Sequence, residues 1–238
     1  MNLLIRLLNY SKRIFNRYNS KKRSANNQAE SLDDRVINFI KIIDDGHGNK
    51  RSFESKKSVD FSGNPIPWFT YPSIEYLKQL DLQSLKILEW GLGNSTLFFA
   101  NRCKSIFSIE HNKQWYDLIK NQLPENANAL LVDESEYVES VIKLREDFDV
   151  IIVDGIKRFD CLKASPKLVR EGGIIIFDNS DRNPEYCEYM RNQNLIQVDF
   201  HGFGPIVNFT TTTSVFYTRT FNIKPLSKQP VIPIGGGY

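Results

Sequence analysis

The stretch ILEWGLGNST, residues 87–96, places a carboxylate, Glu89, two residues before the Gly-x-Gly turn formed by Gly91 and Gly93. Glycines at such a turn leave the backbone bare, so that a ligand can lie directly against it. A dinucleotide-binding turn would carry a third glycine three residues further on, and no glycine stands there. A carboxylate beside the turn would also repel a pyrophosphate. Glu89 therefore indicates a ligand with a cationic end.

A second carboxylate, Glu110, ends the apolar run SIFSIE at residues 105–110. A carboxylate at the end of a strand can accept hydrogen bonds from both hydroxyls of a ribose. An adenosine with a positively charged tail that lacks phosphate is S-adenosylmethionine. The two carboxylates and the glycine turn therefore predict S-adenosylmethionine as the cofactor.

Short runs of branched apolar residues alternate with segments of helical periodicity from residue 86 onward. The expected strands are 86–90, 105–110, 128–132, 148–154 and 172–177, and the expected helices are 95–103, 112–123, 135–144, 160–169 and 183–193. This alternation predicts a parallel sheet with helices on both faces. Two further strands, 195–200 and 213–221, have no helical pattern between them, so we expect the sheet to end in an antiparallel pair.

Acidic or amide residues stand at the carboxyl end of each of the five alternating strands. They are Glu89, Glu110, Asp133, Asp154, and Asp178 with Asn179. Any one of them could cap the next helix. Ligands of such sheets bind at the carboxyl ends of the strands, so five polar ends on one edge favour a binding cleft.

The composition fits one sizeable core with additional segments, because 238 residues with 41% apolar side chains suffice for one catalytic domain. We expect a basic helix and polar linker at residues 1–33, an α/β domain at 34–222, and an extended Pro- and Gly-rich tail at 223–238. The three cysteines have no zinc-like or C-x-x-C spacing, which argues against a disulfide framework and a structural metal site.

Basic charge is concentrated at the N-terminus: residues 1–23 hold seven Lys and Arg and no acidic residue, while the whole chain carries only +3. The rest is net acidic, which argues against nucleic acid as a partner. Apolar residues recur at helical spacing over residues 3–18. Such a helix could lie on an anionic membrane surface, or it could pack on its own domain or on a second subunit of a homo-oligomer. Because no apolar run could span a membrane and no secretory cleavage site is present, we expect a cytoplasmic protein, with the inner face of the membrane as the place of any peripheral contact.

The ordered set of E-x-G-x-G at residues 89–93, the acid at Glu110, FDVIIVDG and LVREGGIIIFDN resembles the class I, seven-stranded S-adenosylmethionine-dependent methyltransferases. The resemblance covers about residues 60–220 and implies a doubly wound sheet of order 3-2-1-4-5-7-6 with the last strand antiparallel. It also implies the roles of the strand ends. The cofactor-binding residues would be Glu89, Gly91 and Gly93 at the methionine end, with Asn94 and Ser95 after them, Glu110 at the ribose, Asp133 near the adenine amine and Asp154 near the methyl group.

A narrower resemblance is to the metal-dependent catechol O-methyltransferases, in which the fourth strand ends in Asp-x-x-Lys and the fifth in Asp-Asn. The present chain has Asp154 with Lys157, and Asp178 with Asn179. The resemblance implies that Asp154, Asp178 and Asn179 bind Mg²⁺ through oxygen and that Lys157 takes the proton of a substrate hydroxyl. The alternative is that Asp178 and Asn179 cap the following helix and that Lys157 is a surface charge.

The segments GNPIPWFTYP, DNSDR and HGFGP are similar to those of uncharacterised bacterial methyltransferases associated with surface-polysaccharide and glycan genes. This similarity implies O-methylation of a small hydroxylated or glycan-type acceptor in polysaccharide biosynthesis. His201 is then an alternative general base, and Trp68, Phe69 and Tyr71 form either a wall for the acceptor or part of the core. Two other functions stay open: a nicotinamide-dependent oxidoreductase of the same sheet, and a cofactor-binding module without catalysis.

Overall fold

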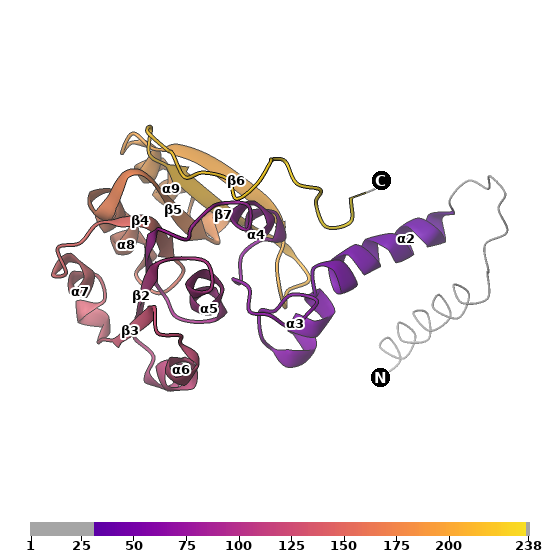
Figure 1. Ribbon diagram of the computed structural model, residues 1–238, viewed down its shortest axis with the longest axis horizontal. Coiled ribbons are helices and arrows are strands. Elements are labelled where there is room, and N and C mark those ends of the chain that lie inside the picture. Colours follow the sequence, from indigo (N-terminus) through magenta and orange to yellow (C-terminus); the bar gives the residue numbers. More distant parts are fainter. Residues whose placement is uncertain (1–30, 237–238) are drawn as a thin grey trace.

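The computed structural model describes residues 31–236, and their central feature is a seven-stranded sheet of order β3-β2-β1-β4-β5-β7-β6 (Figure 1). The strands are β1 (Lys86–Trp90), β2 (Ser105–Glu110), β3 (Ala127–Leu131), β4 (Phe148–Val153), β5 (Val169–Asp178), β6 (Ile196–Phe203) and β7 (Thr210–Tyr217). β1 to β5 pair in parallel, and β7 runs antiparallel to both β5 and β6. The predicted sheet order and the antiparallel last strand are confirmed.

Helices connect the strands and cover the sheet. They are α2 (Leu32–Lys41), the π-helical turn η1 (Ile42–Gly46), α3 (Asn49–Ser55), α4 (Tyr71–Leu77), α5 (Asn94–Ala100), α6 (Lys113–Ile119), η2 (Lys120–Gln122), η3 (Glu134–Glu136), α7 (Glu139–Ile142), α8 (Arg158–Leu168), η4 (Ser180–Arg182) and α9 (Pro184–Arg191).

The core has two layers, because successive residues of each strand point to opposite faces of the sheet. In β4, Val150 and Ile152 pack with α4 and α5, whereas Ile151 and Val153 pack with α7, α8 and α9. All four side chains are fully buried. Burial on both faces keeps the register of the central strands fixed and thereby aligns their carboxyl ends at one edge.

The element bounds differ from the predicted ones where longer-range pairing decides them. β7 begins at Thr210 instead of residue 213, because the β-branched threonines 210–213 pair with the end of β6. β5 begins at Val169, which pairs with Phe148 before an irregularity in the ladder. The helix expected at 135–144 is divided into η3 and α7 around Tyr137, whose side chain is fully buried.

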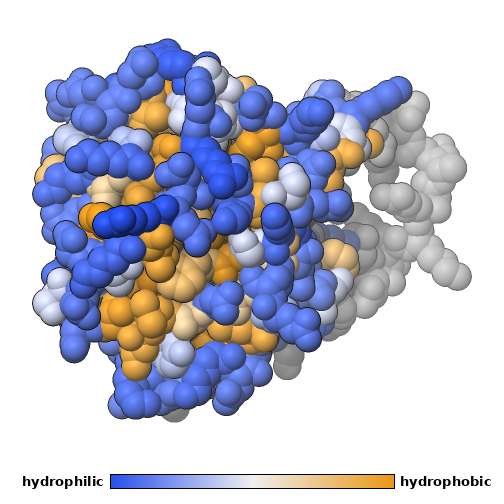
Figure 2. Space-filling model, turned by 60° about the vertical axis from the view of Figure 1, so that its left-hand side comes forward, coloured by the Kyte–Doolittle hydropathy of each residue, from blue (hydrophilic) through white to orange (hydrophobic). Residues whose placement is uncertain are grey.

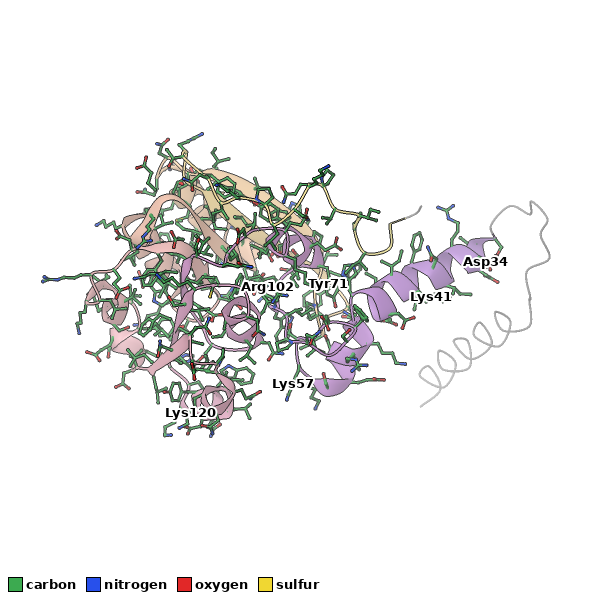
Figure 3. The ribbon with its side chains drawn as sticks, viewed as in Figure 1. Asp34, Lys41, Lys57, Tyr71, Arg102 and Lys120 are labelled. Carbon is green, nitrogen blue, oxygen red and sulfur yellow. The ribbon has the colours of Figure 1, made fainter. Side chains whose placement is uncertain are left out.

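The N-terminal helices and the C-terminal tail lie together beside α4. Tyr71 of α4 stacks on His47 at a centroid distance of 4.2 Å, at the junction with these helices (Figure 3). The tail is held against α4, since Leu226 N–H donates to the Gln79 carbonyl and Ile234 N–H donates to Glu75 Oε2. The basic helix expected at residues 3–18 lies outside the described residues. Within the described part of the chain, no helix is both long and apolar enough to cross a membrane.

The surface is mixed, with polar and charged side chains over much of the face displayed in Figure 2 and hydrophobic side chains gathered between them. Leu118 of α6, Leu130 of β3 and Ile142 of α7 are among the exposed apolar side chains. A homo-oligomer is one of the alternatives that the sequence leaves open, and it stays a prediction.

Candidate active site

A cavity of about 390 Å³ opens at the carboxyl ends of β1, β2 and β4. It is lined by Glu89, Gly91, Leu92, Ser95, Glu110, His111, Asn112, Trp115, Asp154, Gly155 and Ile156. Its volume lies within the roughly 300–1,000 Å³ of small-molecule sites. Five of the residues predicted to bind the cofactor therefore line one cavity: Glu89, Gly91, Ser95, Glu110 and Asp154.

Three residues of the predicted cofactor set do not line the cavity: Gly93, Asn94 and Asp133. Gly93 donates its N–H to Thr96 Oγ1 over 3.0 Å and so opens α5. The Asn94 amide donates to the Ser58 carbonyl, which ties the turn to the preceding loop. Asp133 is exposed at the start of η3. Their contact with a cofactor stays a prediction.

Glu89 is the most deeply buried charged group of the cavity, with no exposed surface. Its Oε1 accepts a hydrogen bond from Ser95, and its Oε2 accepts from Thr96 and from Ser108, the latter over 2.8 Å. Burial raises the pKa of Glu89 to about 7, the three hydroxyl donors oppose this, and the nearby Asp154 adds to it. The hydroxyls also join β1, β2 and the start of α5 around the carboxyl group.

Two glycines bring bare backbone to the cavity. Gly91 has φ +136°, a conformation that side chains rarely adopt, and its N–H donates to the Ile109 carbonyl. Gly155 leaves room for Tyr137, because a Cβ at residue 155 would lie only 2.0 Å from the Tyr137 hydroxyl oxygen. That hydroxyl donates to the Ile109 carbonyl over 3.2 Å. The Tyr137 hydroxyl therefore packs against Gly155 and shares the Ile109 carbonyl with the N–H of Gly91.

We expect Gly155→Ala to lower the free energy of unfolding by about 1–3 kcal/mol, because the methyl group would overlap the Tyr137 hydroxyl. Denaturant unfolding followed by circular dichroism measures this. Adding Tyr137→Phe should recover part of the loss. Gly93→Ala is the matched control, since its Cβ would meet nothing closer than 3.8 Å and its backbone is extended. Equal stability of Gly155→Ala and the unchanged chain would contradict this packing.

Glu110 is buried and presents one oxygen atom to the cavity. Its Oε1 accepts from the backbone N–H groups of His111 and Asn112, over 2.9 and 2.7 Å. Its Oε2 accepts no hydrogen bond from the described residues and is available to a ligand. The sequence interpretation missed Trp115, whose indole N–H donates to the Leu92 carbonyl and whose ring borders the cavity while 45% exposed. An aromatic residue in the first turn after Glu110 was the available signal.

Asp154, at the end of β4, forms an ion pair with Arg158 in which Nη2 lies 3.1 Å from Oδ1. Burial raises the pKa of Asp154 to about 6, while Arg158 acts in the opposite direction. Asp178 is 2% exposed and accepts from Thr213 Oγ1 over 2.6 Å. Its pKa is also raised by burial and by the charge of Asp154. Asp178 and Asn179 do not border the cavity. Arg158 Nη1 contacts both of them, donating to the Asp178 carbonyl and to Asn179 Oδ1.

Of the three predicted catalytic residues, Asp154 lines the cavity. Lys157 is exposed at the N-terminus of α8 with φ +47°. His201 is exposed at the end of β6, and its Nδ1 lies 2.7 Å from Thr212 Oγ1. Among the aromatic residues predicted for the acceptor or the core, Phe69 and Tyr71 are buried and Trp68 is 50% exposed. Catalytic roles for Lys157 and His201 stay predictions.

No family model and no curated protein matches the sequence, but solved structures match the fold. One is a Staphylococcus aureus protein assigned as a caffeoyl-CoA O-methyltransferase, with 16% identity, a TM-score of 0.53, and coverage of 77% of this chain and 97% of that chain. Another is precorrin-6y C5,15-methyltransferase from Geobacter metallireducens GS-15, with 14% identity, a TM-score of 0.52, and coverage of 70% and 96%.

The fold is therefore that of the class I, seven-stranded methyltransferases, as the strand order and these two structures agree. The resemblance seen in the sequence is confirmed at this level. At identities of 14% and 16% these structures show a similarity of fold alone, so the reaction has to be inferred from the residues of the cavity.

Proposed function

We propose that the protein is an S-adenosylmethionine-dependent methyltransferase. The observation that carries this proposal is the buried carboxyl group of Glu89 and the absence of a cationic partner for it among the described residues. Glu89 is one of the residues that line the cavity, its side chain is fully buried, and the partners of its carboxyl group are three neutral hydroxyls. No Lys, Arg or His of residues 31–236 forms an ion pair with it. A buried anion without a counter-charge inside a ligand cavity favours a cationic ligand.

The other residues of the cavity fit the remainder of that cofactor. Glu110 Oε2 can accept from the hydroxyls of a ribose, and its orientation is fixed by two backbone N–H donors to Oε1. The flat ring of Trp115 and the backbone of Gly91 supply surfaces for an adenosine and its chain. A pyrophosphate would meet the buried carboxyl group of Glu89, which counts against the nicotinamide alternative. Quenching of NADH fluorescence on titration would revive that alternative.

When bound, the cofactor supplies an electrophilic methyl group, and the protein must supply position and a proton acceptor. Asp154 is the acidic group at the end of β4 that borders the cavity and can remove a proton from an acceptor hydroxyl. We propose oxygen as the methylated atom for this reason. Since the nucleophile then carries negative charge, alignment with the methyl group provides much of the acceleration.

A hydroxylated, ring-shaped acceptor, as in a glycan, is proposed from the side chains at the same edge of the sheet. Trp68, Phe203 and Phe209 expose aromatic surface. Next to them, Asp181 Oδ1 accepts from Thr211 Oγ1 and from Thr212 N–H, and His201 contacts Thr212. Aromatic faces with nearby polar groups suit a sugar ring. The predictions of a non-nucleic-acid partner, cytoplasmic location and peripheral membrane contact through residues 3–18 stay open to experiment.

The first experiment is calorimetric titration of S-adenosylhomocysteine into the full chain and into Glu110→Gln. We expect saturable binding to the unchanged protein and a loss of affinity of roughly 10- to 100-fold in the variant. The amide keeps an oxygen for the backbone donors but cannot accept two ribose hydroxyls at the other atom. Glu125→Gln is the matched control, because Glu125 is exposed and lies outside the cavity. No binding to the unchanged protein would refute the proposed function.

A further inference from the structure

The guanidinium group of Arg158 joins the carboxyl ends of β4 and β5. Nε donates to the Gly155 carbonyl over 2.9 Å, and Nη2 donates to the Asp154 carbonyl and to Asp154 Oδ1, over 3.0 and 3.1 Å. Nη1 donates to the Asp178 carbonyl over 2.6 Å and to Asn179 Oδ1 over 3.2 Å. A guanidinium has five N–H donors, and these five bonds use all of them. Arg158 is consequently not available to bind an acceptor.

This group occupies the place between the residues expected to hold Mg²⁺. Of the three expected ligand residues, Asp154 and Asn179 each have their Oδ1 atom within 3.2 Å of a guanidinium nitrogen. The third residue, Asp178, directs Oδ1 to the Thr213 hydroxyl. Mg²⁺ requires several oxygen ligands at about 2.0–2.1 Å in octahedral geometry. With a fixed positive charge between the oxygens, the residues present do not fit a divalent cation.

We propose that Arg158 replaces the divalent cation at this position and that methyl transfer by this protein needs no metal ion. The inference rests on the proposed function, which supplies the reaction. In this arrangement, four hydrogen bonds to three backbone carbonyls and to Asn179 fix the guanidinium, and the fifth holds the Asp154 carboxylate at the border of the cavity and offsets its charge. Arg158 is a positioning residue, because it acts on the acceptor through Asp154 and not by contact.

Arg158 also accounts for an acidic pair that would otherwise be uncompensated. Asp154 and Asp178 end neighbouring strands and repel each other, and Asp178 is almost fully buried. Removing the guanidinium leaves the Asp154 carboxyl group, the Asp178 backbone carbonyl and the Asn179 amide oxygen without their shared donor, with the buried Asp178 carboxyl group close to Asp154. Such a set of oxygens is what a hard cation binds. The proposal therefore predicts that a metal site appears when the arginine is removed.

The test is titration of Mn²⁺ into the full-length protein, followed by calorimetry and by the loss of the free Mn²⁺ paramagnetic resonance signal. We expect no saturable binding to the unchanged protein at Mn²⁺ concentrations up to about 1 mM. That concentration is the upper end of the dissociation constants of weak calcium sites in extracellular proteins. Arg158→Ala should bind Mn²⁺ at least about tenfold more tightly, and the double variant with Asp154→Asn should lose this gain. Arg170→Ala removes another arginine that pairs with an aspartate of β4, Asp149, and should gain nothing.

If Arg158→Ala does not fold, Arg158→Lys is measured instead. A single ammonium cannot span five acceptors, so this variant should retain less than a tenth of the turnover without binding Mn²⁺. Saturable Mn²⁺ binding to the unchanged protein that Asp154→Asn abolishes would overturn the proposal, as would loss of turnover after metal chelation. Arg158→Ala that folds and gains no Mn²⁺ affinity would overturn it too. Binding of S-adenosylhomocysteine without metal, measured in parallel, separates these outcomes from failure of the proposed function.

Discussion

Asp154→Asn is expected to lower kcat for methyl transfer by about 10²- to 10⁴-fold while changing the affinity for S-adenosylhomocysteine only a few-fold. The amide keeps an oxygen that can accept from Arg158, so the geometry at the end of β4 is retained. What is lost is the group that takes the proton. Single-turnover kinetics with the acceptor, together with calorimetric binding of the product cofactor, measure the two quantities separately.

The pH dependence gives the same prediction a second measurement. Burial raises the pKa of Asp154 to about 6, so the carboxyl group is protonated below that pH and cannot accept a proton. We therefore expect kcat to rise as the pH increases through about 6 and then to level off. Asp154→Asn should remove this rise along with the activity.

A matched control is Asp160→Asn, which changes an exposed aspartate of α8 that pairs with Lys163. Its kcat should equal that of the unchanged protein. Retention of full kcat by Asp154→Asn would show that Asp154 is not the base, and His201→Ala and Lys157→Ala would then be measured. Loss of turnover with cofactor binding intact would also exclude the cofactor-binding module without catalysis.

The residues that the sequence could predict are those that lie at the end of a strand or directly after it. Glu89, Glu110 and Asp154 each end an apolar run, and the parallel pairing of β1 with β2 and β4 brings all three to one edge. The local sequence pattern was therefore sufficient to predict both the fold and the position of these three side chains at the cavity. The same argument placed Asp133 near the adenine amine. The chain after β3 enters the turn η3, which leaves Asp133 exposed and outside the lining of the cavity, so its contact with a cofactor stays a prediction.

The rest of the site depends on contacts between distant segments. The Trp115 indole N–H donates to the Leu92 carbonyl, and the Tyr137 hydroxyl donates to the Ile109 carbonyl next to Gly155. No periodicity in the sequence reports which of several aromatic residues makes such a contact. The sequence offered no role for Arg158 except that of a surface charge, beside Lys157, in the alternative to the metal site, although it stands four residues after Asp154 at the start of a helix. That spacing was the signal, and the five acceptors around it were visible only in three dimensions.

An effect on cofactor binding as large as that of Glu110→Gln is expected from Glu89→Gln, with a loss of roughly 10- to 100-fold in affinity for S-adenosylmethionine. The amide removes the buried negative charge that we propose attracts the cationic end of the ligand. It keeps one oxygen that can accept from the hydroxyls around it, so the turn should remain folded. Calorimetric titration without acceptor measures the affinity, and thermal unfolding verifies that the variant is intact.

Proton release on binding tests the charge of Glu89 directly. Because burial raises the pKa of Glu89 to about 7, the free carboxyl group is largely protonated below pH 7 and anionic above it. A cationic ligand binds the anion, so affinity should rise as the pH increases from about 6 to 8, and binding below pH 7 should release a proton. Titrations at one pH in buffers of different ionisation enthalpy measure this release. In Glu89→Gln both the release and the rise in affinity should vanish.

Two neighbours of Glu89 should move the midpoint of this pH dependence in opposite directions. Ser108→Ala removes a hydrogen bond that favours the anion, so the midpoint should rise above that of the unchanged protein. Asp154→Asn removes a negative charge that disfavours the anion, so the midpoint should fall. A midpoint that neither substitution shifts would mean that another group takes up the proton. Glu89 would then be a structural carboxyl group whose three hydroxyl bonds hold the glycine turn, and the cationic end of the ligand would have to meet Asp154 instead.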